Sequence, residues 1–559
     1  MLRDRSRMRP IFPISFALLT FASSALADDD PTSSSEEFSR LVLDTGRLTP
    51  PKASAEWIHL TVHGEAQLRG QLERSFPLDV TATTKSLHPN AIEDSIGQNA
   101  FITSWIRITP RLTIKDNIAI TAQADLLSGF VFGQTAHGTS PDQYPRDNGG
   151  DWGTYVAPRW LYLDWRTPYG LFRIGQQPNH WGMGILANDG DHPSVFGDYR
   201  GGAISERILF GTKPAGKDSP FTIAIAGDLV YRDWQARLSR GDIAWQGVLA
   251  GYWEKGYNQL GVFSIIRSQS TSKQSGGDYN PYSDTLSAGV VDLAGKFAAP
   301  VPGNPSTWVF GAAELAAIFG STNQLRTPEQ ALRNSETTIR SYGGAAQLGF
   351  VHRNSQEVKK GSPLNWGDFV AQLEIGYASG DSDPYDGTER RFTFDPNHRV
   401  GLVLFDEVMR WQTARTSAAA QDPLLANGAR PAPGVNLLPS NGAVFGAQYI
   451  YPTMIARPVP NLDLKFGAVI AQTTADLVDP YRVATQGAYV NYRGGDSRRH
   501  DLGIELDGGF EWRVKLDREL VLQLGAQAGV LFPGGALANA DGQTMKAPWL
   551  AAMRVGLQF

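Results

Sequence analysis

Two histidines and a group of aspartates are the first side chains whose spacing could support chemistry. His59 and His63 lie four residues apart in a stretch where polar and apolar residues alternate, so a strand would place both on one side. Imidazole nitrogens bind transition metals. No third ligand stands beside the pair in the sequence. We therefore interpret both histidines as polar residues lining one face of a strand.

An acidic turn is the second candidate. Residues 379–387 read SGDSDPYDG, and Asp381, Asp383 and Asp386 could together bind calcium, which prefers oxygen ligands. Their spacing does not follow the EF-hand pattern, and a solvated turn is the alternative. No other cofactor is expected.

Composition argues against several classes of enzyme and partner. The chain has no cysteine, which removes thiol nucleophiles, cysteine zinc sites, disulfides and an acylated N-terminal cysteine. No G-x-S-x-G motif occurs. The formal net charge is −5, and it becomes −8 without the first 27 residues, which carry four arginines and one aspartate. This acidity argues against nucleic acid as a partner, and we expect no enzymatic activity.

The N-terminus has the pattern of a secretory signal peptide. Four arginines at positions 3, 5, 7 and 9 precede a mostly apolar stretch, residues 11–26, which is short for a membrane anchor. The sequence Ala-Leu-Ala then predicts cleavage between Ala27 and Asp28. Residues 1–27 are therefore the expected signal peptide, and residues 28–54 a polar periplasmic tail.

No later stretch reaches the roughly 18 consecutive apolar residues of a transmembrane helix. Residues 502–515 instead alternate strictly between apolar and charged side chains, and so do residues 106–115. A period of two predicts strands with one apolar face and one ionised face. In the strand that follows the turn at 517–519, Leu524 is expected to face lipid and Gln523 the interior.

Eighteen such strands can be counted, although sixteen is the alternative. A soluble β-sandwich also alternates, but these strands run to 10–15 residues and approach the length of a tilted membrane span. Tight turns alternate with long polar loops, as at the periplasmic and outer ends of a barrel. The sequence predicts an all-β, closed, antiparallel transmembrane barrel over residues 55–559. The expected spans are 56–73, 103–115, 118–127, 156–166, 170–177, 201–211, 220–230, 243–254, 258–267, 284–298, 307–319, 339–352, 367–378, 442–456, 462–473, 501–515, 520–532 and 547–559.

The last residues carry a sorting pattern. Val555, Leu557 and Phe559 alternate with polar or small residues up to the end of the sequence. We interpret them as the signal that outer-membrane barrels present to the barrel-assembly machinery, and we expect the lipid bilayer to be the other partner. The expected location is the outer membrane.

Charged residues of the inward parity predict the lining of a pore. Arg107, Arg111 and Lys115 form a ladder of cations on one strand, whereas Glu505, Asp507 and Glu511 lie late in the chain. This predicts a basic sector and an acidic sector; pairing of the arginines with carboxylates across the lumen is the alternative. The expected pore-lining residues are Arg69, Arg107, Arg111, Lys115, Arg166, Arg173, Glu505, Arg513 and Lys515.

The longest predicted loop runs from residue 379 to about residue 441. Within it, Leu404, Val408 and Trp411 have helical spacing. A short helix lying over or inside the mouth of the barrel is expected there.

Several segments resemble the alginate-export family of outer-membrane porins. They are the hairpin 500–537, which begins HDLGIELD and ends LFPGGAL, with 175–177 (GQQ) and 378–381 (ASGD), together 45 of the 559 residues. The resemblance implies a monomeric eighteen-stranded barrel whose basic constriction passes a polyanion. Here the inward basic and acidic residues nearly cancel, so export of alginate does not follow. We expect a channel for polar solutes or a polysaccharide; the alternatives are a barrel that serves as adhesin or assembly partner, and a barrel-wall enzyme.

Overall fold

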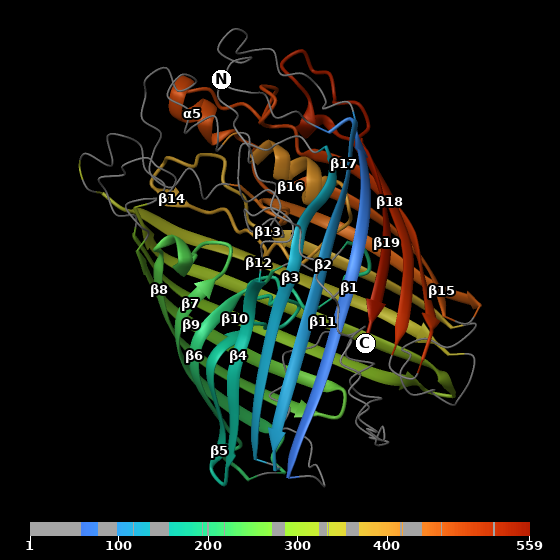
Figure 1. The fold of residues 1–559 in the computed structure, drawn as a ribbon. Coiled ribbons are helices and arrows are strands. Elements are labelled where there is room, and N and C mark those ends of the chain that lie inside the picture. Colours follow the sequence, from blue (N-terminus) through green and yellow to red (C-terminus); the bar gives the residue numbers. More distant parts are fainter. Residues whose placement is uncertain are drawn as a thin grey trace, which may run out of the picture.

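The computed structural model is an antiparallel β-barrel, closed where the first strand pairs with the last (Figure 1). It describes residues 57–76, 98–115, 117–134, 156–192, 194–197, 201–216, 218–270, 285–323, 333, 335–353, 368–413, 416, 439–459, 461–517 and 520–559. The expected signal peptide, its cleavage site at Ala27 and Asp28, and the tail 28–54 lie outside these residues.

The sheet has nineteen strands, and eighteen of them form the wall. The remaining strand, β14 (Thr388–Glu389), pairs in parallel with the outer end of β12 and belongs to a loop. The wall strands are β1 (Ile58–Arg74), β2 (Gln98–Ile114), β3 (Ile118–Gln134), β4 (Val156–Thr167), β5 (Gly170–Pro178), β6 (Ile204–Thr212), β7 (Phe221–Arg232), β8 (Ile243–Lys255), β9 (Asn258–Ser270), β10 (Thr285–Val301), β11 (Asn304–Thr322), β12 (Thr337–His352), β13 (Phe369–Ala378), β15 (Ala447–Val459), β16 (Leu462–Thr473), β17 (Asp501–Lys515), β18 (Val521–Pro533) and β19 (Trp549–Gln558). Eighteen strands is the number predicted from alternation, and sixteen is wrong.

Alternation along each strand separates an apolar outside from a polar inside. On β17, Ile504 and Trp512 are 46% and 47% exposed, whereas Glu505 and Glu511 are 0% and 8% exposed. In water this would invert the usual burial of apolar residues. An apolar outer belt is the arrangement of a wall that spans a bilayer.

Aromatic side chains gather near the end of the barrel where the turns are short. Trp165 of β4, Phe172 of β5 and Phe210 of β6 lie in a row, with ring centroids 5.8 Å and 4.7 Å apart. Rings of this kind lie at the interface between lipid and water. They mark the periplasmic rim of the belt.

Long connections extend from the opposite end, where Figure 1 shows the loops crowded above the wall. The short helices in these connections include η1 (Leu238–Arg240), the π-helix η2 (Leu404–Met409), α5 (Pro480–Gln486) and η4 (Gly535–Leu537). Among the described residues, no helix is both long and apolar enough to cross a membrane.

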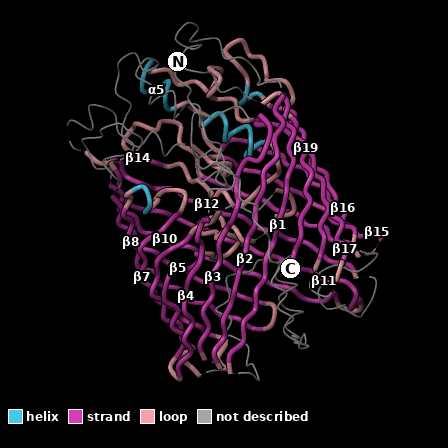
Figure 2. Tube along the Cα trace, viewed as in Figure 1, coloured by secondary structure: helices cyan, strands magenta, loops and turns pink. Residues whose placement is uncertain are grey.

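Two long connections fold back into the barrel. We call the described residues of 179–203, between β5 and β6, the first inward segment, and the described residues of 392–446, between β13 and β15, the second. Their apolar side chains pack on inward-facing residues of the wall, such as Ala316 of β11 and Val469 of β16. The second segment contains η2, so the predicted short helix is confirmed and lies within the barrel (Figure 2). The buried residues of this core that belong to the two segments include Met183, Ile185, Phe196, Phe392, Phe394, Leu402, Leu404, Phe405, Val408, Met409 and Trp411.

The two faces of β18 give a direct test of the wall. Leu524 stands opposite Val555, which is 51% exposed on the outward face of β19, whereas Gln523 is buried inside at 5% exposure. We expect Leu524→Arg to destabilise the folded barrel by roughly 2–4 kcal/mol, because it places a charge against lipid. Gln523→Arg, the matched control, should have a mild effect. Urea unfolding in lipid vesicles measures both, and equal damage would contradict the assigned faces.

Candidate functional site

The first inward segment is fixed to the far side of the wall by buried carboxylates. Glu314 of β11 is fully buried and accepts hydrogen bonds from the backbone N–H groups of Met183 and Ile185, the latter at 3.3 Å. Asp292 of β10 accepts one from the indole Nε1 of Trp181 at 3.2 Å. Since the segment starts on β5 and these acceptors lie on β10 and β11, it crosses the interior.

A group of four charges holds the segment near its other end. Arg107 of β2 makes a two-point contact with Asp125 of β3, at 2.7 Å and 3.0 Å, and also contacts Asp191 of the segment. Arg159 of β4 lies 3.9 Å from Asp125 and 3.7 Å from Asp191. Two cations thus face two anions and leave no net charge. They also tie the segment to three neighbouring strands.

A carboxylate of the wall holds the second inward segment where η2 begins. Glu505 of β17 accepts hydrogen bonds from three consecutive backbone N–H groups, those of Leu402, Val403 and Leu404, at 2.5 Å, 2.7 Å and 2.7 Å. These donors precede and begin η2, where a helix has N–H groups without partners of its own and favours an anion. Glu505 therefore caps the helix and fixes it to the wall.

The two inward segments also contact each other. The Asp395 N–H donates to the Ile185 carbonyl at 2.7 Å, and the His398 Nδ1 lies 3.0 Å from the Met183 carbonyl. The other ring nitrogen of His398 lies 3.1 Å from Glu374 of β13. Together the segments form one structure that is attached to the wall on several sides. Such a structure occupies part of the interior of the barrel.

Several predicted pore-lining cations are ion-paired. Arg107 is paired as described above, and Arg173 lies 2.6 Å from Asp164. Arg513 contacts Glu511 at 2.9 Å and Asp463 at 2.8 Å. The prediction that Arg107 belongs to a ladder of unpaired cations is therefore wrong. Pairing with carboxylates, the alternative that the sequence allowed, occurs mostly between neighbouring strands.

The remaining predicted lining residues differ in exposure. Arg69 is buried, Arg111 and Arg166 are half-buried, and Lys115 and Lys515 are exposed beside periplasmic turns. Within the described parts of the chain, no carboxylate lies within ion-pair distance of Arg111 or Arg166.

Of the acidic residues expected late in the chain, Glu505 and Asp507 lie buried next to each other on the inward face of β17, whereas Glu511 is balanced by cations. Glu511 is surrounded by Lys465 at 3.1 Å, Arg554 at 3.0 Å and Arg513. Glu505 is a helix cap rather than an exposed lining residue. The sequence placed both carboxylates on the inward face and could not show which groups they would meet.

The acidic turn makes its own hydrogen bonds. Asp381 accepts from the backbone N–H groups of Asp383 at 3.0 Å and Arg390 at 2.8 Å, and Asp386 is paired with the Arg390 guanidinium at 2.8 Å. Asp383 accepts from the Tyr489 hydroxyl at 2.9 Å. Among the described residues, Asp381, Asp383 and Asp386 do not form a group of converging metal ligands. The geometry thus agrees with a solvated turn and gives calcium no support.

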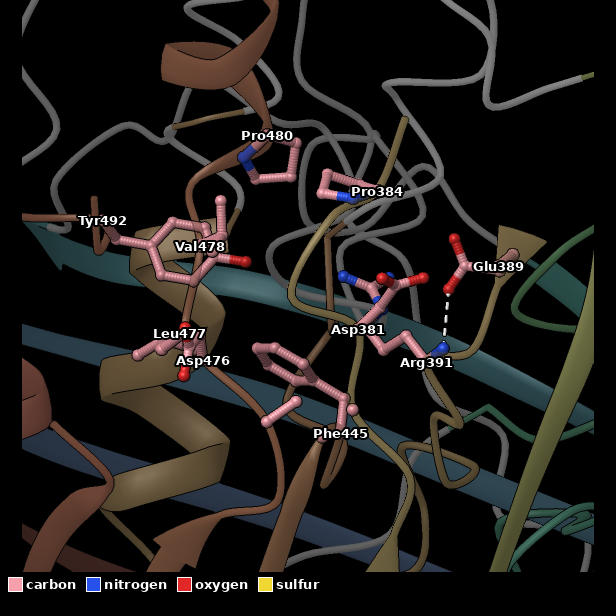
Figure 3. Close-up of a pocket in the computed structure, with 13 residues that line it drawn as sticks. Asp381, Pro384, Glu389, Arg391, Phe445, Asp476, Leu477, Val478, Pro480 and Tyr492 are labelled. Atoms are coloured by element: carbon pink, nitrogen blue, oxygen red, sulfur yellow. Dashed lines mark hydrogen bonds between the residues drawn. The ribbon is translucent and has the colours of Figure 1, made fainter. Parts of the chain in front are cut away.

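A small pocket lies beside this turn, outside the membrane-spanning strands, where parts of two outer loops meet (Figure 3). Glu389 and Arg391 line it together with Tyr492, and the Arg391 N–H donates to Glu389 at 2.9 Å. Loss of hydration raises the pKa of Glu389 to about 7.

The raised pKa of Glu389 predicts that the stability of the outer loop around it depends on pH. Because folding raises the pKa of this carboxyl from 4.5 to about 7, its contribution to stability is complete below about pH 4.5 and is lost as the pH rises through about 7. After correction for intrinsic exchange rates, the amides of residues 388–392 should be better protected from hydrogen exchange at pH 5 than at pH 8. Glu389→Gln should remove this difference, and equal protection of the wild type at both values would contradict it.

His59 and His63 lie near the periplasmic end of β1, half-buried and exposed respectively. The residues that hold the inward segments, above all Glu314 and Asp292, were not found from the sequence. Their partners lie 111–131 positions away along the chain. No local spacing signals such a contact.

Comparisons with known proteins give likeness of structure only. No family model matches the chain, and no curated protein matches it. Similar solved structures include OccAB1 of Acinetobacter baumannii (TM-score 0.45, 7% identity, 92% of this chain and 100% of that one), OccK5 (OpdH) of Pseudomonas aeruginosa (0.43, 8%, 89% and 98%) and the outer membrane channel DcaP of Acinetobacter baumannii (0.36, 9%, 91% and 100%). Identities this low leave the function to be argued from the chain's own residues.

The architecture of the barrel wall indicates the cellular location of the chain. Eighteen antiparallel strands close on themselves, so no strand edge meets lipid, and an apolar belt surrounds a polar interior. The chain is an outer-membrane β-barrel. Two segments that are attached to several strands of the wall narrow its interior. A constriction of this kind is a feature expected of a channel.

Proposed function

We propose that this barrel is a monomeric, passive channel that carries small polar solutes across the outer membrane. The observation that carries the proposal is the attachment of the inward segments, Glu505 to η2 and Glu314 to the first segment. A barrel that served only as an anchor would not require its loops to be held inside the lumen. Loops held in this way define the size of solute that passes.

The charges along the wall favour a weakly selective channel over one for a polyanion. Arg107, Arg173 and Arg513 each contact carboxylates, so most of their charge is balanced. A polysaccharide rich in carboxylates would need a continuous series of available cations. Alginate export, implied by the family resemblance, is therefore not the function that we propose.

A conductance measurement tests the proposal. The purified chain in a planar bilayer should give discrete, reproducible conductance steps and should admit small sugars into vesicles in a swelling assay. An adhesin, an assembly partner or a barrel-wall enzyme would give neither result. Absence of steps from folded, inserted protein would overturn the proposal.

Arg111 provides a prediction on ion selectivity. Its guanidinium is half-buried on the inward face of β2, and the described residues offer it no carboxylate, so Arg111→Ala removes a positive charge that ions in the lumen experience. At low salt, where screening is weak, the reversal potential should shift toward cation selectivity. Lys255→Ala, at the exposed turn after β8, removes the same charge at the rim and serves as control. Equal shifts for both variants would show that Arg111 lies off the ion path.

A further inference from the structure

Two histidines and an aspartate come together on the first inward segment. The ring nitrogens of His180 and His192 and a carboxylate oxygen of Asp189 all lie within 4.8 Å of one another. The His192 Nδ1 is 2.9 Å from the Asp189 Oδ1, and the His180 Nδ1 is 3.9 Å from the same oxygen. The two imidazole rings are stacked, with centroids 3.7 Å apart.

We propose that His180, Asp189 and His192 bind one divalent transition-metal ion of the Zn²⁺ type. Two imidazoles and a carboxylate are a common ligand set for zinc, with bonds of about 2.0–2.2 Å. Two ligand atoms of a tetrahedral ion with such bonds lie about 3.4 Å apart. The observed separations of 2.9 Å and 3.9 Å fall on either side of that value. Metal binding also requires the two stacked rings to rotate out of their near-parallel arrangement, so that one nitrogen of each ring points at the ion. A water molecule would take the fourth position.

The segment already holds Asp189 in position. The Asp189 carbonyl accepts from Arg159 Nη2 at 2.7 Å, and its Oδ1 accepts from the Asp191 N–H at 2.9 Å. On the other side, Asn188 accepts from the Gly190 N–H at 2.9 Å. Groups that orient the ligands raise affinity for the metal, because less order must be imposed when it binds.

Burial of the three side chains also suits a metal site. The side chains of His180 and Asp189 are 4% and 7% exposed, whereas that of His192 is 25% exposed. An ion can thus enter past His192 and lose most of its water at the other two ligands. It would replace the proton shared by His192 and Asp189 and join residues that lie twelve positions apart in the segment. The result would be a more rigid constriction.

Binding is tested on the full chain, purified without a polyhistidine tag and folded in detergent. Isothermal titration with ZnCl₂ should give one site per chain, and CoCl₂ should produce the visible absorption of tetrahedral Co²⁺. His192→Ala and Asp189→Asn should each weaken Zn²⁺ binding at least tenfold and abolish the Co²⁺ band. His352→Ala, which removes an exposed imidazole next to Thr307, should leave both signals unchanged.

Heat-modifiability on gels identifies variants that fail to fold, and Asp189→Asn keeps the shape of the side chain if His192→Ala is lost. No Zn²⁺ binding by the wild type, or equal binding by the folded Asp189→Asn variant, would overturn the proposal. The titration measures binding alone, so its failure would leave the proposed channel function untouched.

Discussion

Replacing Glu505 with alanine should raise the conductance of the channel and make it noisy. The carboxylate accepts three backbone hydrogen bonds from residues 402–404. A hydrogen bond to a charged group stabilises by about 1.5–3 kcal/mol, and buried donors that lose their partner add a penalty. Without this cap the second inward segment should detach from β17 and move within the lumen. Single-channel recording measures the mean conductance and its variance.

Two variants serve as controls for this effect. Glu505→Gln keeps one oxygen acceptor and should fall between the wild type and alanine. Glu206→Ala removes a half-buried carboxylate from the outward face of β6 and should leave conductance unchanged. Unaltered conductance and noise in a folded Glu505→Ala variant would show that η2 does not narrow the path.

The strands could be predicted because their signal is local. The two-residue period of the sequence indicates which face each residue takes, and every wall strand is only 9–19 residues long. The pair Arg107 and Asp125 was within reach of the same reasoning. A hairpin that turns at residue 116 places positions 107 and 125 opposite each other, which is the observed register.

The inward segments could not be predicted in this way. Glu505 and its three donors lie 101–103 positions apart, and Asp191 lies 84 positions from Arg107. The hydrophobic residues of the second segment indicated a helix, but an apolar helix in a loop can pack over the mouth as well as inside it. Only the closed wall brings β17 and η2 together. This separation along the chain explains why the sequence identified the inward carboxylates but not the backbone N–H groups and side chains that they bind.

Deleting Phe559 should prevent assembly in the outer membrane. The terminal residue closes the wall: its N–H donates to the Gly64 carbonyl at 3.0 Å, and its carbonyl accepts from the Gly64 N–H at 2.7 Å. Its ring lies over Gly64, where any side chain would collide with it. Loss of Phe559 leaves part of the seam between β1 and β19 open to lipid, which offers no hydrogen bonds in exchange. It also removes the last of the three outward-facing residues that we interpret as the insertion signal.

The measurement is the amount of heat-modifiable barrel in isolated outer membranes, with the periplasmic fraction probed in parallel. Phe559→Tyr keeps the ring and both backbone bonds, so it should assemble at wild-type levels. Gly64→Val should reproduce the defect of the deletion with an intact C-terminal sequence, because its side chain displaces the ring. Assembly of Gly64→Val together with failure of the deletion would assign Phe559 to recognition by the assembly machinery rather than to closure of the seam. Normal outer-membrane levels of the deletion variant would contradict both roles.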